Sequence, residues 1–168
     1  MKYLLFTIVL LGAASALAFE IKGIQPGMTL EAFNKAYADA QCKPESVDDS
    51  LVCRYGSNPI SQNNPPLPTR LQTIAEKSVN YLELMIVKGK IGNAKAYLGR
   101  DDFSSLLVSL GHKYGKSKGI GSIGVAWTSK NEMMMLTIAP GLTMLSWSDL
   151  TLMSPENKKK LDKRTKDL

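Results

Sequence analysis

The chain has 168 residues, a formal net charge of +6 and an ordinary share of apolar and aromatic residues, which suits one globular domain with a buried core. Six basic and three acidic side chains fall within residues 154–168, so the basic excess is concentrated at the C-terminus. A charge excess this mild, without arginines interleaved with aromatic residues, argues against a nucleic-acid-binding protein.

The first eighteen residues have the layout of a secretory signal peptide. A basic start precedes an apolar run over 4–11, and Ala16-Leu17-Ala18 forms a small-x-small cleavage site. The apolar run is too short for a membrane-spanning helix, which needs about 20 residues. We expect cleavage after Ala18, no membrane span, and a periplasmic or secreted mature chain that begins at Phe19. A phenylalanine at this position, in place of cysteine, departs from the bacterial lipoprotein pattern.

The first elements of the mature chain are predicted from turn residues and apolar spacing. We expect a strand over 19–24, a helix that begins after Thr29 and ends near Gln41, and a strand over 50–55. Four prolines fall within 56–68, which excludes an interior helix or strand and predicts an exposed loop. One face of the helix carries Leu30, Phe33, Tyr37 and Ala40.

The rest of the chain is predicted to contain one further helix, with strands before and after it. Apolar residues at helical spacing predict a helix over 103–114, capped by Asp101 or Asp102 and ended by Gly115. A glycine-rich loop is expected over 115–124. The predicted strands cover 70–76, 79–87, 91–98, 123–129, 132–139 and 142–148.

The resulting fold class is α+β, with helices packed on an antiparallel sheet. We interpret residues 19–153 as this domain and consider its division into two tandem helix-plus-sheet units, 19–98 and 99–153. Ser154-Pro155-Glu156 is a favourable helix start. Residues 154–168 are therefore expected to form a short basic helix or tail.

Two cysteines, Cys42 and Cys53, lie in the mature chain. In an oxidising compartment the ordinary expectation is one structural disulfide between them. A redox pair usually has Cys-x-x-Cys spacing, and a metal site needs more ligands than these cysteines and one histidine supply.

Residues 19–55 resemble a known group of small exported proteins. Ile24-Gln25-Pro26-Gly27-Met28-Thr29 leads into a helix, Cys42 follows, and Leu51-Val52-Cys53-Arg54 comes next. This pattern resembles the first repeat of the β-lactamase-inhibitor-protein-like group and of the SmpA/OmlA outer-membrane assembly proteins. The resemblance implies a helix on an antiparallel sheet, a disulfide between the two cysteines, and a binding protein rather than an enzyme. The second half departs from the pattern, since it has no second Gly-Met-Thr and no cysteine pair.

No motif supports catalysis or a cofactor. Residues 119–124 fit G-x-G-x-x-G, but a predicted helix precedes them and a strand follows, the reverse of a dinucleotide site. His112 is the only histidine, and a hydrolase would have to use it; we interpret it as a surface or capping residue. Met133 and Met135 share one face of a predicted strand, which leaves copper binding as a minor alternative to core packing.

The function that these observations favour is protein binding through the sheet and its neighbouring loops. Tyr81, Trp127 and Trp147 lie on predicted strands, and we expect two to be core residues and one to mark a contact surface. The partner would be an extracytoplasmic enzyme that is inhibited, or an envelope assembly component. One alternative is contact with an anionic envelope surface through the basic C-terminus, with Lys158, Lys159 and Lys160 as its centre. Another is an unrecognised hydrolase.

Overall fold

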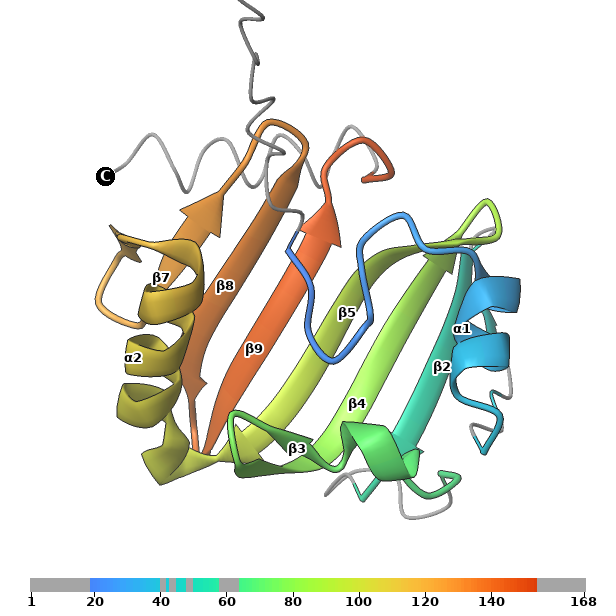
Figure 1. Cartoon of the computed structure of the whole chain (residues 1–168), viewed down its shortest axis with the longest axis horizontal. Helices are drawn as coiled ribbons and strands as arrows, with labels where there is room; N and C mark the ends of the chain where they lie inside the picture. The colour runs from blue at the N-terminus through green and yellow to red at the C-terminus, as the bar shows by residue number, and fades with distance from the viewer. Residues whose placement is uncertain (1–18, 40–41, 43–44, 48–49, 58–63, 154–168) are drawn as a thin grey trace, which may run out of the picture.

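An open antiparallel sheet with two helices packed on it forms the fold (Figure 1), which confirms the α+β prediction. The structure is a computed structural model that describes residues 19–39, 42, 45–47, 50–57 and 64–153. The predicted signal peptide and the basic C-terminal segment lie outside the described residues.

Eight strands follow one another in the order β1-β2-β4-β5-β9-β8-β7-β6, and the short β3 pairs with β4 beside this path. The strands that precede α2 therefore meet the strands that follow it where β5 pairs with β9. This order gives one continuous sheet. The strands are β1 Glu45–Val47, β2 Ser50–Gly56, β3 Thr73–Ile74, β4 Lys77–Val87, β5 Lys90–Gly99, β6 Lys118–Ile120, β7 Gly124–Thr128, β8 Glu132–Ala139 and β9 Leu142–Asp149.

Both helices lie on the same face of the sheet, α1 over β2 and α2 over β7 and β8 (Figure 1). The helix α1 spans Leu30–Ala36 and buries Phe33, whereas α2 spans Phe103–Tyr114 and buries Leu106 and Leu110. These side chains join one core with alternate residues of the strands, because successive side chains of a strand point to opposite faces. We call this side the helix face of the sheet.

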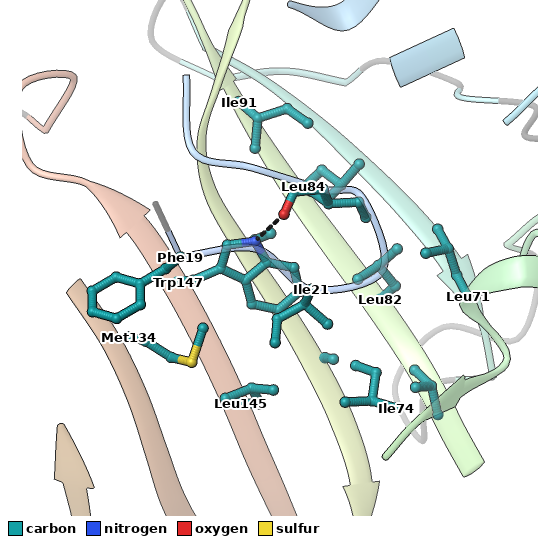
Figure 2. Close-up of a cluster of buried hydrophobic side chains, with 14 of the residues drawn as sticks. Phe19, Ile21, Leu71, Ile74, Leu82, Leu84, Ile91, Met134, Leu145 and Trp147 are labelled. Atoms are coloured by element: carbon teal, nitrogen blue, oxygen red, sulfur yellow. Dashed lines mark hydrogen bonds between the residues drawn. The ribbon is translucent and has the colours of Figure 1, made fainter. Parts of the chain in front are cut away.

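Between the two helices, residues 19–28 run across the middle of the helix face (Figure 1). The indole Nε1 of Trp147, on β9, donates a buried hydrogen bond of 3.2 Å to the Ile24 carbonyl oxygen (Figure 2). Gly27 N donates to the Ile91 carbonyl, and Ile91 N donates to the Met28 carbonyl, each at 2.7 Å. The segment is therefore a part of the core, which it joins through both side chains and backbone.

The strand predicted over 19–24 is wrong. Ile21 and Ile24 instead pair with each other across a tight turn, through two backbone hydrogen bonds of 3.1 and 3.0 Å. The turn residues Lys22 and Gly23 both have positive φ, 53° and 84°, which is the conformation of a type I′ turn. This turn folds the segment back before a strand can extend.

The first helix begins as predicted but ends at Ala36, earlier than the expected Gln41. Thr29 Oγ1 accepts a hydrogen bond from Ala32 N at 3.1 Å, which confirms Thr29 as the N-cap. At the other end Tyr37 has left the helical conformation, and its hydroxyl donates to the Lys22 carbonyl oxygen. This contact with the N-terminal segment replaces another helical turn.

The second helix matches its predicted range, 103–114, and ends at Gly115 with φ 80°. Asp102 occupies the N-cap position of α2, as predicted, but its side chain makes no hydrogen bond to the first turn of this helix. Residues Arg100–Asp102 form a 3₁₀ turn, and Asp102 Oδ2 accepts from Gly99 N at 3.0 Å. The carboxylate thus caps the turn that leads into the helix.

Two further segments differ from the predictions. In place of a strand over 70–76, a 3₁₀ turn (Thr69–Leu71) precedes the two-residue β3. The glycine-rich segment 115–124 contains the short strand β6. The strands predicted over 50–55, 79–87, 91–98, 123–129, 132–139 and 142–148 are found within one or two residues of their expected ends. Of the proline-rich loop, the described residues 64–68 have no regular structure.

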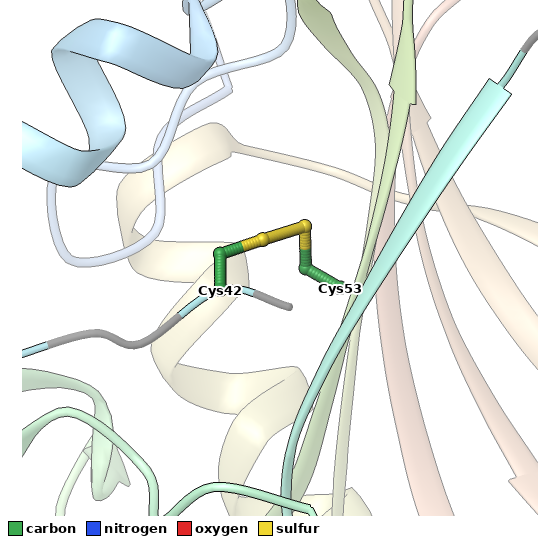
Figure 3. Close-up of a disulfide and its surroundings, with 2 residues drawn as sticks. All are labelled: Cys42 and Cys53. Atoms are coloured by element: carbon green, nitrogen blue, oxygen red, sulfur yellow. A yellow bond between two sulfur atoms is a disulfide. The ribbon is translucent and has the colours of Figure 1, made fainter. Parts of the chain in front are cut away.

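The disulfide between Cys42 and Cys53 is present (Figure 3), as the cysteine count predicts. Cys53 lies on β2 and is fully buried in the core, and Cys42 packs against that core. The bond therefore ties the chain after α1 to the sheet. A disulfide is compatible with an oxidising, extracytoplasmic location. Neither α1 nor α2 is long and apolar enough to cross a membrane.

The β3–β4 hairpin turn carries avoidable backbone strain. Its two residues, Ala75 and Glu76, have φ 47° and 65°, a conformation that favours glycine. We predict that Glu76→Gly raises the free energy of unfolding by about 0.5–1 kcal/mol. The substitution removes the steric strain of a side chain at positive φ, and this gain exceeds the entropy cost of glycine. Urea denaturation measures the change. The opposite substitution, Gly89→Ala in the β4–β5 turn (φ 72°, with no atom within 4 Å of the added Cβ), should lower it by about 1 kcal/mol. A loss of stability in Glu76→Gly would contradict the strain assigned to the β3–β4 turn.

Two buried tyrosines on the helix face should respond oppositely to loss of the hydroxyl. The Tyr55 hydroxyl has no hydrogen-bond partner among the described residues, and burial raises the Tyr55 pKa well above its usual range. The Tyr37 hydroxyl donates to the Lys22 carbonyl. We predict that Tyr55→Phe raises the free energy of unfolding by up to about 1 kcal/mol and that Tyr37→Phe lowers it by about 1–2 kcal/mol. Thermal and urea denaturation compare the two variants. Equal effects of the same sign would show that the two hydroxyls are not in the environments described.

Candidate binding face of the sheet

The side chains of the strands that point away from the helix face form a second face. Among the described residues, neither helix covers this second face. Its residues follow from the strand register, because each core residue alternates with a residue on the other side. They include Arg54, Tyr81, Glu83, Met85, Asn93, Lys95, Tyr97, Met133, Met135, Met144, Ser146 and Ser148.

Three charged residues lie side by side across β2, β4 and β5. The register places Arg54 opposite Glu83 and Glu83 opposite Lys95. Glu83 Oε1 is 2.8 Å from Lys95 Nζ, and Glu83 Oε2 is 3.6 Å from Arg54 Nε. The single carboxylate is shared by two cations, so this charged row has a net charge of +1. Each pair is partly exposed and contributes little to stability by itself.

A row of tyrosine and methionine lies beside the charged row. Tyr81 on β4 stands opposite Tyr97 on β5, and Tyr97 stands opposite Met144 on β9. The two tyrosine rings have centroids 5.3 Å apart and are tilted by 51°, a favourable aromatic contact. Tyr81 is 4% exposed, whereas Tyr97 is half-buried. Tyr97 is thus the more accessible ring of the pair, and Tyr81 supports it.

An open hollow of about 1310 Å³ adjoins this tyrosine pair, at the end of the sheet where β4 begins and β5 ends. Both tyrosines and Glu83 line it, and the proline-rich loop contributes Pro66 and Leu67. Backbone bonds hold that loop in place, since Gly56 N donates to the Pro65 carbonyl at 2.8 Å and Ser57 N to the Asn80 carbonyl at 3.0 Å. The lining mixes apolar side chains with polar ones, among them Gln72, Ser78 and Asn80.

The three aromatic residues singled out in the sequence separate between the two faces. Trp147 and Trp127 lie in the core of the helix face, 1% and 3% exposed, and Trp127 Nε1 donates to the Gly115 carbonyl at 2.8 Å. Tyr81 lies on the second face, beside Tyr97. We therefore retain Tyr81 in the candidate site and assign both tryptophans to packing. Lys158, Lys159 and Lys160 lie outside the described residues.

Four members of the candidate site were missed by the sequence analysis: Arg54, Glu83, Lys95 and Tyr97. The sequence feature that could have identified them is the alternation of residue types along β4 and β5. In these strands Glu83, Lys95 and Tyr97 occupy every second position, between small or aliphatic residues. The pairing of β2, β4 and β5 brings these side chains together, and pairing partners are not visible in one sequence.

The methionine cluster is divided as its period of two predicts. Met134 is fully buried with Leu136 in the core of the helix face. Met133 and Met135 lie on the second face, where Met133 is also buried and Met135 is half-buried. His112 is exposed on the last turn of α2. In the described part of the chain, no three His, Cys, Asp or Glu side chains form a group that could hold a metal ion.

No protein-family model matches the chain, and neither the curated proteins nor the solved structures contain a match. The candidate face is therefore defined by its own geometry.

The charged row should control the ionisation of Tyr97. Burial raises the Tyr97 pKa, Lys95 opposes the rise and Glu83 adds to it. We predict that Lys95→Gln raises the Tyr97 pKa further and that Glu83→Gln lowers it, which NMR titration of the Tyr97 ring carbon would measure. Because folding raises this pKa, the unfolded state loses its proton first, and stability falls as the pH rises above about 10. Shifts of the same sign in both variants would contradict the assigned geometry.

Proposed function

We propose that the protein is an exported, non-catalytic protein-binding module of the bacterial cell envelope that contacts its partner around Tyr97. The observation that carries this proposal is the second face of the sheet. The described residues place no helix over it, and it combines the Tyr81–Tyr97 pair, a hollow and three half-buried methionines, Met85, Met135 and Met144. Aromatic and methionine side chains are enriched at protein interfaces.

The chemistry of the face suggests the kind of partner segment that it binds. The tyrosine pair and Leu67 offer apolar contacts to an aliphatic or aromatic side chain. The row of Arg54, Glu83 and Lys95 has a net positive charge, which favours a carboxylate nearby. We therefore propose a polypeptide segment with an apolar residue beside an acidic one. An inhibited extracytoplasmic enzyme or an envelope assembly component would supply it.

The resemblance of residues 19–55 to the β-lactamase-inhibitor-protein-like and SmpA/OmlA groups is part of this proposal. The order of elements supports it, since α1 precedes the strands β1, β2, β4 and β5 and α2 precedes β6 to β9. Two related helix-plus-sheet units, joined where β5 pairs with β9, would give this order. The disulfide supports export because such bonds persist in oxidising compartments.

The decisive experiment is affinity capture from native envelope extract, with the partner identified by mass spectrometry at low and high salt. We predict one stoichiometric partner that survives high salt and whose affinity falls about tenfold or more in Tyr97→Ala, the loss expected for an interface hot spot. Tyr97→Phe should retain most of the affinity, because it keeps the ring that packs on Tyr81.

A matched control is an exposed residue of α2, on the opposite side of the sheet from Tyr97. Val108 on α2 is 60% exposed, and Val108→Ser should leave capture unchanged. Equal losses in Tyr97→Ala and Val108→Ser would argue against the second face as the contact surface. Retention that disappears at high salt and on deletion of residues 154–168 would instead favour contact of the basic C-terminus with an anionic surface.

A further inference from the structure

Two acidic residues face each other at the end of the helix face where residues 19–28 begin. Glu132 on β8 lies directly opposite Asp149 on β9. The next pair on the same face is Met134 opposite Trp147, both in the core. Like charges in opposite positions repel each other. Across the described ranges, neither carboxylate forms an ion pair with a lysine or arginine, and Asp149 Oδ1 accepts hydrogen bonds from Thr151 N and Oγ1 at 2.8 and 2.6 Å.

The backbone nitrogen of Phe19 contacts one member of this pair, Glu132. Phe19 N donates a hydrogen bond of 2.7 Å to Glu132 Oε2. The Phe19 ring is 4% exposed and packs edge-on against the Tyr114 ring, with centroids 5.2 Å apart. Figure 2 shows the same ring beside Met134. Residue 19 is therefore held firmly by its side chain and by its nitrogen.

The next residue is fixed by α2. The Tyr114 hydroxyl accepts from Glu20 N at 3.1 Å and donates to the Glu20 carbonyl at 2.5 Å. Lys113 Nζ donates to the same carbonyl at 3.1 Å. These contacts fix the direction in which the chain approaches Glu132, so the nitrogen of residue 19 cannot move away without breaking them.

We propose that the chain is cut between Ala18 and Phe19 and that Glu132 binds the α-ammonium group that the cut creates. Water adds to the Ala18–Phe19 peptide bond, in a reaction catalysed by a signal peptidase of the host. Ala18 leaves with the new carboxylate, and the Phe19 amine takes up a proton. The new cation then lies against the Glu132 carboxylate, and Asp149 stands opposite Glu132 on β9.

The consequence is a mature protein more stable than its precursor. With the leader attached, the Phe19 nitrogen is a neutral amide that donates one hydrogen bond. After the cut, the same nitrogen makes a charge-assisted bond, which is shorter and about twice as strong. It also relieves the repulsion between Glu132 and Asp149. Removal of the leader thereby stabilises the packing of residues 19–28 against the sheet.

The test uses the full chain, exported and processed in a bacterial host, in four forms. The first is the natural sequence, and the second carries Gly-Ser inserted between Ala18 and Phe19, so that processing leaves a two-residue extension. The third and fourth repeat these with E132Q, whose amide oxygen can still accept from a backbone N–H. We expect intact mass to give Phe19 as the first residue of the natural form. Its Tm should exceed that of the extended form by roughly 3–6 °C.

The E132Q pair separates charge from packing. Here the Tm difference between natural and extended N-termini should shrink to about 1 °C or less, because no carboxylate remains for the ammonium group to contact. Acylation of the α-amine by an amine-reactive ester should be several-fold faster in E132Q than in the natural form. An undiminished Tm difference in E132Q, an unchanged acylation rate, or processing at another bond would overturn the proposal. These readouts are independent of any partner, so they test this site separately from the proposed function.

Discussion

The hydrogen bond from Trp147 Nε1 to the Ile24 carbonyl fixes residues 19–28 over the centre of the sheet. The space that this segment fills is created by small side chains. Ala94 and Ala96 of β5 stand opposite Trp147 and Leu145 of β9, all fully buried on the helix face. The helices lie to either side, α1 over β2 and α2 over β7 and β8 (Figure 1). Without the N-terminal segment, the alanines where β5 meets β9 would lack a covering layer, and interiors tolerate such voids poorly.

This arrangement gives the two faces of the sheet different roles. The helix face is covered by four parts of the chain, namely α1, α2, residues 19–28 and the segment 69–74, and contains both tryptophans. The second face instead carries tyrosine, methionine and the charged row of Arg54, Glu83 and Lys95. Under the proposed function, the sheet is a rigid support for recognition, because the proposed contact residues stand on strands rather than on loops. The hollow beside Tyr97 lies where that support meets the proline-rich loop.

Local patterns in the sequence predict the local structure well. The spacing of Leu106 and Leu110 predicts α2, alternation predicts the long strands, and the two cysteines predict their disulfide. Thr29 is identified as a cap by its type and place. One misjudged part was decided by a contact distant in sequence and the other by a local turn. The first helix stops at Ala36 because Tyr37 bonds to Lys22, and 19–24 turns back because Lys22 and Gly23 adopt left-handed conformations.

The candidate site was predicted less completely, for a physical reason. Which face of a strand is buried depends on its neighbours in the sheet, and the pairing of β5 with β9 joins residues about fifty positions apart. A sequence therefore identifies Tyr81, Trp127 and Trp147 as notable but does not assign them to faces. The contact of Phe19 with Glu132 spans 113 positions, and it too follows only from the assembled sheet.

The most direct test of this account is native-state hydrogen exchange of the exported, processed protein, observed by NMR. If residues 19–28 are part of the central core, the Trp147 indole N–H and the amides of Gly27 and Ile91 should exchange only through global unfolding, as slowly as the amides of β5 and β9. Exchange of the indole and of Gly27 at the rates of a fraying terminus, while β5 and β9 remain protected, would show that the sheet is complete without this segment and would contradict the account.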